Sequence, residues 1–245
     1  MSFDEPSRRA FLAGSVVAVG AGGAYYLTRS DESHDDESHG LSPEFHASDE
    51  TSTLGVELAG KPIMGSPEAP IDLYYWTDFQ CPFCAQFERE TLPDLVREYV
   101  DPGRIRVVFV TVPFFGGDSM TAAVASRCVW EQVQETERSA YWNWHAAVFD
   151  EQGEKNSGWA AADNLVEYTR SVSGVDADAL ATCLDERRST YEEEIDANAA
   201  QARSFGISGT PAFLAFDPET EAGEALAGAQ PIDRFEEAIE AVEDA

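Results

Sequence analysis

The stretch that decides the fold is Ile71-Asp72-Leu73-Tyr74-Tyr75-Trp76, which leads within a few residues to Cys81-Pro82-Phe83-Cys84. The first part is a short apolar and aromatic run of the kind that forms a buried strand. Proline fits the first turn of a helix, so we predict a helix from Pro82 to about Val100. The valine-rich segment from Arg104 to Val112 then predicts a second strand. Strand, helix and strand in this order predict the start of an α/β sheet, with the cysteines at the turn into the helix.

The rest of the chain predicts an interruption of this sheet and then its return. Residues 117–205 have helical periodicity and few prolines, so we expect an all-helical insertion of several helices. After it, Pro211 to Phe216 predicts a strand, Glu224 to Ala227 a weaker one, and Pro231 to about Val242 a closing amphipathic helix. The fold class is therefore α/β with a helical insertion.

The four cysteines divide into a pair, Cys81 and Cys84, and two isolated residues, Cys128 and Cys183. A cysteine at a helix N-terminus has its thiolate favoured by the macrodipole and by unpaired backbone N–H groups, and Cys81 has that position. Its thiolate would attack a disulfide, and Cys84 would resolve the mixed intermediate. Zinc would need a second pair of ligands, and the remaining candidates, which include His145, are not suitably spaced. The pattern favours redox chemistry, with no metal and no cofactor.

Two motifs in order give the chain a family resemblance. The segment from Trp76 to Cys84, the later Gly209-Thr210-Pro211-Ala212-Phe213 and the helical insertion between them resemble the DsbA-like branch of the thioredoxin superfamily. The likeness covers about Lys61 to Val242 and implies a thioredoxin-like fold for the domain, which we place at residues 54–245. It also implies a cis Pro211 beside the cysteine pair and a Thr210 backbone free to pair with a substrate strand. The expected active-site face consists of Pro82, Phe83, Thr210 and Pro211.

The chain departs from the thioredoxin pattern six residues before the first cysteine. Thioredoxins and many relatives carry a buried acid there, whereas this chain has Tyr75. A carboxylate there would help proton transfer from the resolving cysteine, so that step must use water or another group. Asp78 lies nearer the motif, and we favour a turn-capping role for it over a catalytic one.

Cys128 and Cys183 both fall in predicted helices of the insertion. Similar exported proteins of the DsbA-like groups often join these helices by a structural disulfide, and the resemblance implies one here. Such a bridge would contribute about 3 to 4 kcal/mol in an oxidising compartment. The alternative is two buried free thiols.

The N-terminal residues predict export. Ser7-Arg8-Arg9-Ala10-Phe11-Leu12 places two arginines before an apolar run that reaches Leu27, which is the layout of a twin-arginine signal. Residues 1–28 are therefore an export signal, or a membrane anchor if the signal is not removed. Residues 29–53 are acidic and polar, which predicts a disordered linker. Its histidines are interpreted as solvated side chains rather than metal ligands: His34, His39 and His46.

The net charge of the chain limits the classes of molecule that it can bind. With 46 acidic against 16 basic side chains, the net charge is −30, which excludes binding of nucleic acid or of anionic lipid through charge. Acidity of this extent with only two lysines, Lys61 and Lys155, is typical of proteins that work at high salt, so a halophilic source is a hypothesis.

Together these features predict an exported thiol-disulfide oxidoreductase that donates disulfides to secreted or cell-surface proteins through Cys81 and Cys84, with its N-terminal segment as either a signal or a membrane anchor. The resemblance implies reoxidation by a membrane quinone-linked partner of the DsbB or vitamin K epoxide reductase type. Two alternatives stay open at this point. One is an extracytoplasmic reductase or isomerase, and the other is a module that binds a soft metal such as Cu(I) through the same two cysteines.

Overall fold

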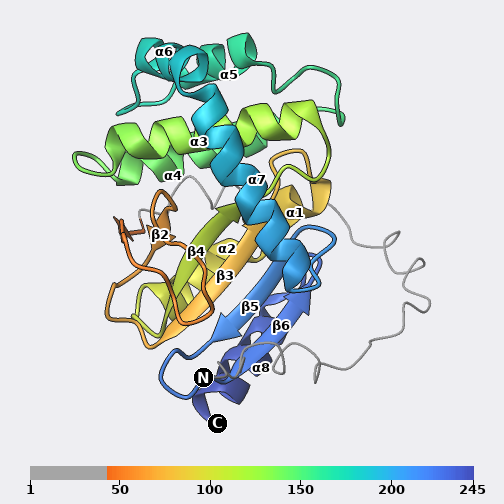
Figure 1. The fold of residues 1–245 in the computed structure, drawn as a ribbon. Coiled ribbons are helices and arrows are strands. Elements are labelled where there is room, and N and C mark those ends of the chain that lie inside the picture. Colours follow the sequence, from red (N-terminus) through yellow and green to blue (C-terminus); the bar gives the residue numbers. More distant parts are fainter. Residues whose placement is uncertain (1–42) are drawn as a thin grey trace, which may run out of the picture.

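The computed structural model describes residues 43–245, which form a six-stranded mixed sheet of order β1-β2-β4-β3-β5-β6 with helices on both faces and beyond one end (Figure 1). The predicted export signal or anchor at 1–28, most of the predicted linker, and both His34 and His39 lie outside the described residues. Within 43–245, no helix combines the length and the apolar character that crossing a bilayer requires.

The centre of the sheet is built from the strands that the sequence predicted. β3 (Ile71–Thr77) is buried along its whole length and pairs in parallel with β4 (Ile105–Thr111). On its other side β3 pairs antiparallel with β5 (Ala212–Phe216), which pairs with the edge strand β6 (Gly223–Ala227). A strand enclosed on both sides and both faces is mostly apolar, and the one charged side chain of β3, Asp72, accepts a hydrogen bond from Arg106 Nε at 2.6 Å.

Two hydrophobic clusters cover the two faces of the sheet, because successive side chains of a strand point in opposite directions. Leu73 and Tyr75 of β3 join the larger cluster, which also contains the insertion helices and the C-terminal helix α8 (Ile232–Glu243). Tyr74 and Trp76 join the smaller cluster on the other face. One group of aromatic side chains in the insertion is buried: Tyr141, Trp142, Trp144, His145 and Phe149.

The folded domain begins earlier than predicted, so the linker assignment is wrong for residues 43–53. Phe45 and His46 form strand β1, which pairs with β2 (Ile63–Met64), and β2 in turn pairs with β4. The Phe45 ring is 6% exposed and lies 5.7 Å from the ring of Tyr141, centroid to centroid. Burial of this one aromatic ring in the main core holds the segment to the domain, although the residues around it are polar. His46 is accordingly part of the fold, with its Nδ1 2.9 Å from the Gly65 carbonyl oxygen.

The helix predicted from Pro82 to Val100 is broken into three pieces. They are α1 (Pro82–Glu90), α2 (Leu92–Leu95) and the π-helical turn η3 (Val96–Val100). Pro93 has no N–H to donate to the carbonyl one turn earlier, and its ring crowds that carbonyl, so the helix is interrupted just before it. The Thr91 hydroxyl at the break donates to the Gln230 carbonyl, 2.9 Å away, which ties the break to the loop before α8.

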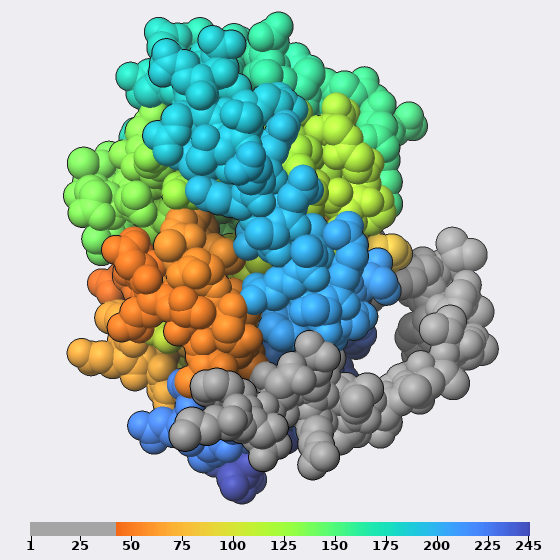
Figure 2. Space-filling model, viewed as in Figure 1, coloured from red at the N-terminus to blue at the C-terminus, as the bar shows by residue number. Residues whose placement is uncertain are grey.

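The helical insertion is present, and its boundaries agree with the prediction. It consists of α3 (Gly117–Val133), α4 (Ser139–Asp150), α5 (Ala162–Thr169), α6 (Ala177–Glu186) and α7 (Arg188–Ser204). The first four lie beyond the end of the sheet at which β3 and β4 finish, and α7 returns across one face of the sheet (Figure 1). Figure 2 shows α7 lying against the first described residues, where the Gln201 amide donates to the Gly55 carbonyl, 2.7 Å away. A disulfide joins Cys128 of α3 to Cys183 of α6, with an S–S distance of 2.07 Å.

Replacing Phe45 by alanine tests the earlier start of the domain. Because the ring is buried against the aromatic core, Phe45→Ala should lower the free energy of unfolding by about 3 kcal/mol, measured by chemical denaturation. Asp49→Ala, at an exposed position of the same segment, should leave it unchanged. An unchanged unfolding free energy for Phe45→Ala would mean that residues 43–53 are not docked.

The double substitution Cys128→Ser and Cys183→Ser tests the disulfide. Since the bridge spans 55 residues, removing it should lower the free energy of unfolding by about 3 to 4 kcal/mol. Intact mass after alkylation without reductant provides the direct count. Four alkylated thiols in the untreated wild-type protein would exclude the bridge.

Candidate active site

The site is built at the turn between β3 and α1, and the Asp78 carboxylate holds this turn. It accepts hydrogen bonds from the backbone N–H groups of Gln80 at 2.9 Å and Phe114 at 2.8 Å, and from the Ser119 hydroxyl at 2.8 Å. Burial raises the pKa of Asp78, while these hydrogen bonds oppose the rise. Both carboxylate oxygens are therefore occupied in structural bonds, which agrees with the capping role favoured from the sequence.

Cys81 and Cys84 are both free thiols, and their positions at the start of α1 make them chemically different. Cys81 is the N-cap residue of α1, and its Sγ lies 3.1 Å from the Thr210 carbonyl oxygen. The hydrogen bond from the Cys84 thiol lowers the pKa of Cys81 to about 6 against the effect of burial, and the backbone N–H groups of Cys84 and Phe83 act in the same direction. Burial raises the pKa of Cys84 well above its ordinary value, and Cys81 adds to this shift. At neutral pH the pair is thus one thiolate and one thiol.

The predicted active-site face gathers around Cys81. The Thr210–Pro211 peptide bond is cis, and β5 begins at the next residue. Antiparallel pairing of β5 with β3 brings this loop to the end of β3, where the cysteine turn begins. Phe83 is 60% exposed and is the one large hydrophobic side chain exposed among residues 43–245. The predicted residues Pro82, Phe83, Thr210 and Pro211 therefore lie on elements that meet at the Cys81 sulfur.

A loop of the insertion holds the same turn from the opposite side. The Gln152 side-chain amide donates to the Phe79 carbonyl at 2.6 Å and to the Cys81 carbonyl at 3.1 Å. The Asn156 backbone N–H donates to Gln80 Oε1 at 2.6 Å. Sequence reasoning missed these residues because polar side chains in a loop carry no periodic signal, and their partners lie more than seventy positions away in the chain.

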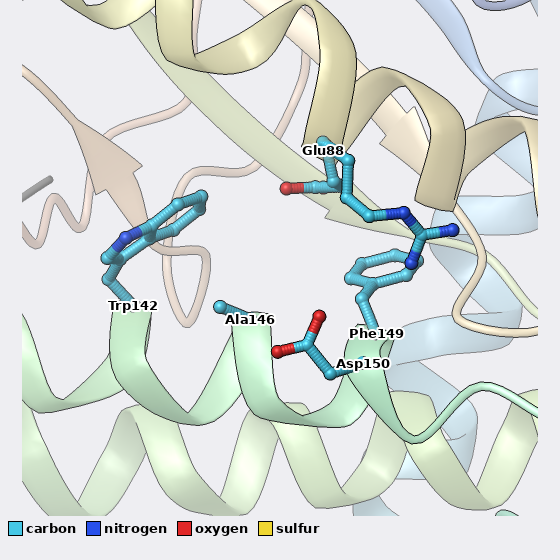
Figure 3. Close-up of a pocket in the computed structure, with 6 residues that line it drawn as sticks. Glu88, Trp142, Ala146, Phe149 and Asp150 are labelled. Atoms are coloured by element: carbon cyan, nitrogen blue, oxygen red, sulfur yellow. The ribbon is translucent and has the colours of Figure 1, made fainter. Parts of the chain in front are cut away.

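A second group missed from the sequence is a buried acid and histidine behind Cys84. Glu88 of α1 is 4% exposed and His145 of α4 is 0% exposed, with His145 Nε2 2.9 Å from Glu88 Oε1. A small pocket between the two helices is lined in part by Glu88, and Figure 3 shows Glu88 facing α4 across it. The available signal was the position of Glu88, one helical turn after Cys84 and on the same helix face.

No three side chains among the histidines, cysteines, aspartates and glutamates of residues 43–245 come together as a metal site. Both cysteines are buried, with Cys81 1% and Cys84 0% exposed, but Cys81 caps α1 directly before the exposed Phe83 turn. This arrangement suits attack on a disulfide at one sulfur.

Comparisons with known proteins agree with this geometry. The family model described as Thioredoxin matches residues 57–241. Disulfide bond formation protein D of Bacillus subtilis is 25% identical over 160 residues, which cover 65% of this chain and 69% of that protein. The crystal structure of oxidised BdbD from Bacillus subtilis is similar with a TM-score of 0.66 at 22% identity, covering 82% of this chain and 100% of that one. The crystal structure of Chlamydia trachomatis DsbA has a TM-score of 0.63 at 24% identity, and the match covers 74% of this chain and 91% of that one.

The two cysteine pKa values predict how the reduced protein reacts with iodoacetamide. Because the pKa of Cys81 is lowered to about 6, the alkylation rate at Cys81 should be constant above about pH 7 and fall tenfold per pH unit below 6. Cys84 should stay unmodified across this range, since its pKa is raised. Rates read by mass spectrometry check both statements, with Cys81→Ser as the control that should not react. A midpoint near pH 8.5 to 9 would contradict the assignment of Cys81 as the thiolate.

Proposed function

This chain belongs to the thioredoxin family, and from that premise we propose that it is a DsbA-like thiol-disulfide oxidoreductase that donates disulfides to exported proteins. The observation that carries the direction is the lowered pKa of Cys81 at the N-terminus of α1. A stabilised Cys81 thiolate makes the reduced enzyme the favoured form at neutral pH. An enzyme whose reduced form is stable gives its disulfide away.

The reaction follows from the different environments of the two sulfurs. In the oxidised enzyme a substrate thiolate attacks Cys81 Sγ, the Cys81–Cys84 bond breaks, and Cys84 leaves and takes up a proton. A second substrate thiolate then attacks the substrate sulfur of the mixed disulfide and releases Cys81 as a thiolate. The substrate loses two electrons and the enzyme gains them. Cys81 is a good leaving group in the second step because its pKa is low.

The surface around Cys81 suits an unfolded polypeptide substrate. The exposed Phe83 offers an apolar contact beside the reactive sulfur. The Thr210 backbone lies against that sulfur, so an extended substrate segment that pairs with it would carry its cysteine to Cys81. Selectivity would then depend on an accessible cysteine in an extended chain more than on a particular sequence.

The place of work and the redox partner belong to the same proposal. The arginine pair and apolar run in residues 1–28 support export, with the segment acting either as a removed signal or as an anchor. Reoxidation would come from a membrane quinone-linked protein of the DsbB or vitamin K epoxide reductase type. The net charge of −30 supports a high-salt environment, in which counter-ions screen the repulsion among carboxylates.

Trapping of substrates tests the proposed reaction. Cys84→Ser whose Cys81 has first been converted with oxidised glutathione to the glutathione mixed disulfide should exchange glutathione for a thiol of reduced, unfolded model proteins. The resulting enzyme–substrate mixed disulfides should accumulate, because the resolving thiol is missing. Cys81→Ser is the matched control and should trap none. Non-reducing gels and mass spectrometry identify the linkage.

Thiol counting on both partners then fixes the direction of transfer. The oxidised wild-type protein should convert substrate thiols into disulfides while Cys81 and Cys84 become reduced. If the protein were a soft-metal module, the Cys84→Ser variant would trap no substrate. If it were a reductase, most substrate thiols would remain unoxidised after incubation with the wild-type protein. Either result would contradict disulfide donation.

A further inference from the structure

Each catalytic cycle moves a proton at Cys84, and the structure places this thiol away from water. Cys84 is buried and its pKa is raised, so it is a poor leaving group as a thiolate and a poor nucleophile as a thiol. Tyr75, which stands where thioredoxins carry a buried acid, is itself buried, and burial raises its pKa far above any working pH. Another group must therefore exchange protons with Cys84.

Glu88 is the buried carboxyl group placed for this exchange. It lies one turn after Cys84 on α1, so both side chains point from the same helix face into the core. The charges of both Cys84 and Glu88 act on the Tyr75 hydroxyl of β3 and add to the rise of its pKa that burial causes. The Thr77 hydroxyl donates to Tyr75 Oη at 3.0 Å, which leaves the Tyr75 proton free to be donated elsewhere. Tyr75 thus stands between the thiol and the carboxylate.

The Glu88–His145 pair is not explained by stability alone. Burying an acid and an imidazole is costly unless every polar atom is paired. Glu88 Oε2 and His145 Nδ1 are both buried and have no hydrogen-bond partner among residues 43–245. His145 orients the carboxylate through the 2.9 Å contact at Oε1 and leaves the other oxygen available for a proton.

A small pocket between α1 and α4 lies beside Glu88. It is lined by Glu88 and by Arg89, Trp142, Ala146, Phe149 and Asp150. Figure 3 shows Glu88 and Asp150 bordering this pocket from facing helices. The other titratable or charged groups that face Glu88 are Cys84 and Arg89 from α1, Tyr75 from β3, and Tyr141, His145 and Asp150 from α4.

We infer that Glu88, oriented by His145 and connected through the Tyr75 hydroxyl, is the positioning residue that exchanges the Cys84 proton with solvent. The inference rests on the proposed function for the direction of the cycle. During reoxidation the Cys81 thiolate attacks a disulfide of the partner and forms a mixed disulfide with one of its two sulfurs, while the other leaves as a thiolate. The Cys84 S–H proton then passes to Glu88, and the Cys84 sulfur attacks Cys81 Sγ. The Cys81–Cys84 bond forms, the bond to the partner breaks, and the partner sulfur leaves as a thiolate with the electrons. During donation the same path returns a proton to Cys84.

Single-turnover oxidation of the reduced full-length protein by oxidised glutathione isolates this step. Formation of the glutathione adduct at Cys81 and its resolution by Cys84 are followed separately by acid quench and mass spectrometry between pH 5 and 9. Glu88→Gln keeps the shape of the side chain and a hydrogen bond to His145 but cannot take up the proton. Resolution in this variant should slow by roughly 10²-fold near pH 6 and rise tenfold per pH unit toward the wild-type rate.

Three further measurements separate proton exchange from a structural role. Adduct formation at Cys81 should stay at the wild-type rate in Glu88→Gln. Glu90→Gln, an exposed carboxyl on the same helix, should resolve like the wild type at every pH. Tyr75→Phe keeps the ring between Phe87 and Phe213 and should reproduce the steep pH profile, so the inference stays testable if Glu88→Gln does not fold.

The outcomes distinguish this inference from the proposed function. Resolution at the wild-type rate and pH profile in both Glu88→Gln and Tyr75→Phe would overturn the inference and leave disulfide donation intact. Equal slowing at all pH values would also overturn it, because that pattern reports lost packing. A steep pH profile in an enzyme that proves to be a reductant would keep the inference and overturn the direction of the function.

Discussion

The structure depends on the hydrogen bonds that hold the Cys81 sulfur at the N-terminus of α1. A thiolate there is stabilised by the Cys84 thiol and by the backbone N–H groups of Phe83 and Cys84. Each large element contributes to that position. β3 delivers the turn, Asp78 fixes it, and β5 brings Thr210 against the sulfur because it pairs with β3. The insertion closes the site through Gln152, which binds the carbonyls of Phe79 and Cys81.

The same turn of helix gives its two cysteines opposite properties. Three residues separate them in sequence, yet Cys81 caps the helix while Cys84 points into the core. Stabilising the thiolate of Cys81 and the thiol of Cys84 favours the reduced enzyme, which is what a disulfide donor needs. The Cys84 thiol must nevertheless lose its proton in each cycle, and Glu88, paired with His145, lies one turn after Cys84 on α1. The proposed redox direction and the inferred proton transfer therefore both follow from one helix position.

Local patterns were sufficient to predict the central strands, the helical insertion and the cysteine pair. The continuous apolar run of β3 and the residues that flank Cys81 and Pro211 act over short distances, so they are visible in the sequence. Docking of Phe45 was not predictable, because it depends on a cavity formed by residues far along the chain. The pairing of Glu88 with His145 and that of Gln80 with Asn156 could not be predicted for the same reason, although the position of Glu88 one turn after Cys84 carried a local signal. The break before Pro93 carried a local signal and was nevertheless missed.

The most direct measurement is the reduction potential of the Cys81 and Cys84 pair, determined by equilibration with glutathione at high salt. If the Cys81 thiolate stabilises the reduced enzyme, the potential should lie between about −120 and −180 mV, the range of disulfide donors. A potential near about −270 mV would mark a thioredoxin-like reductant and would contradict disulfide donation.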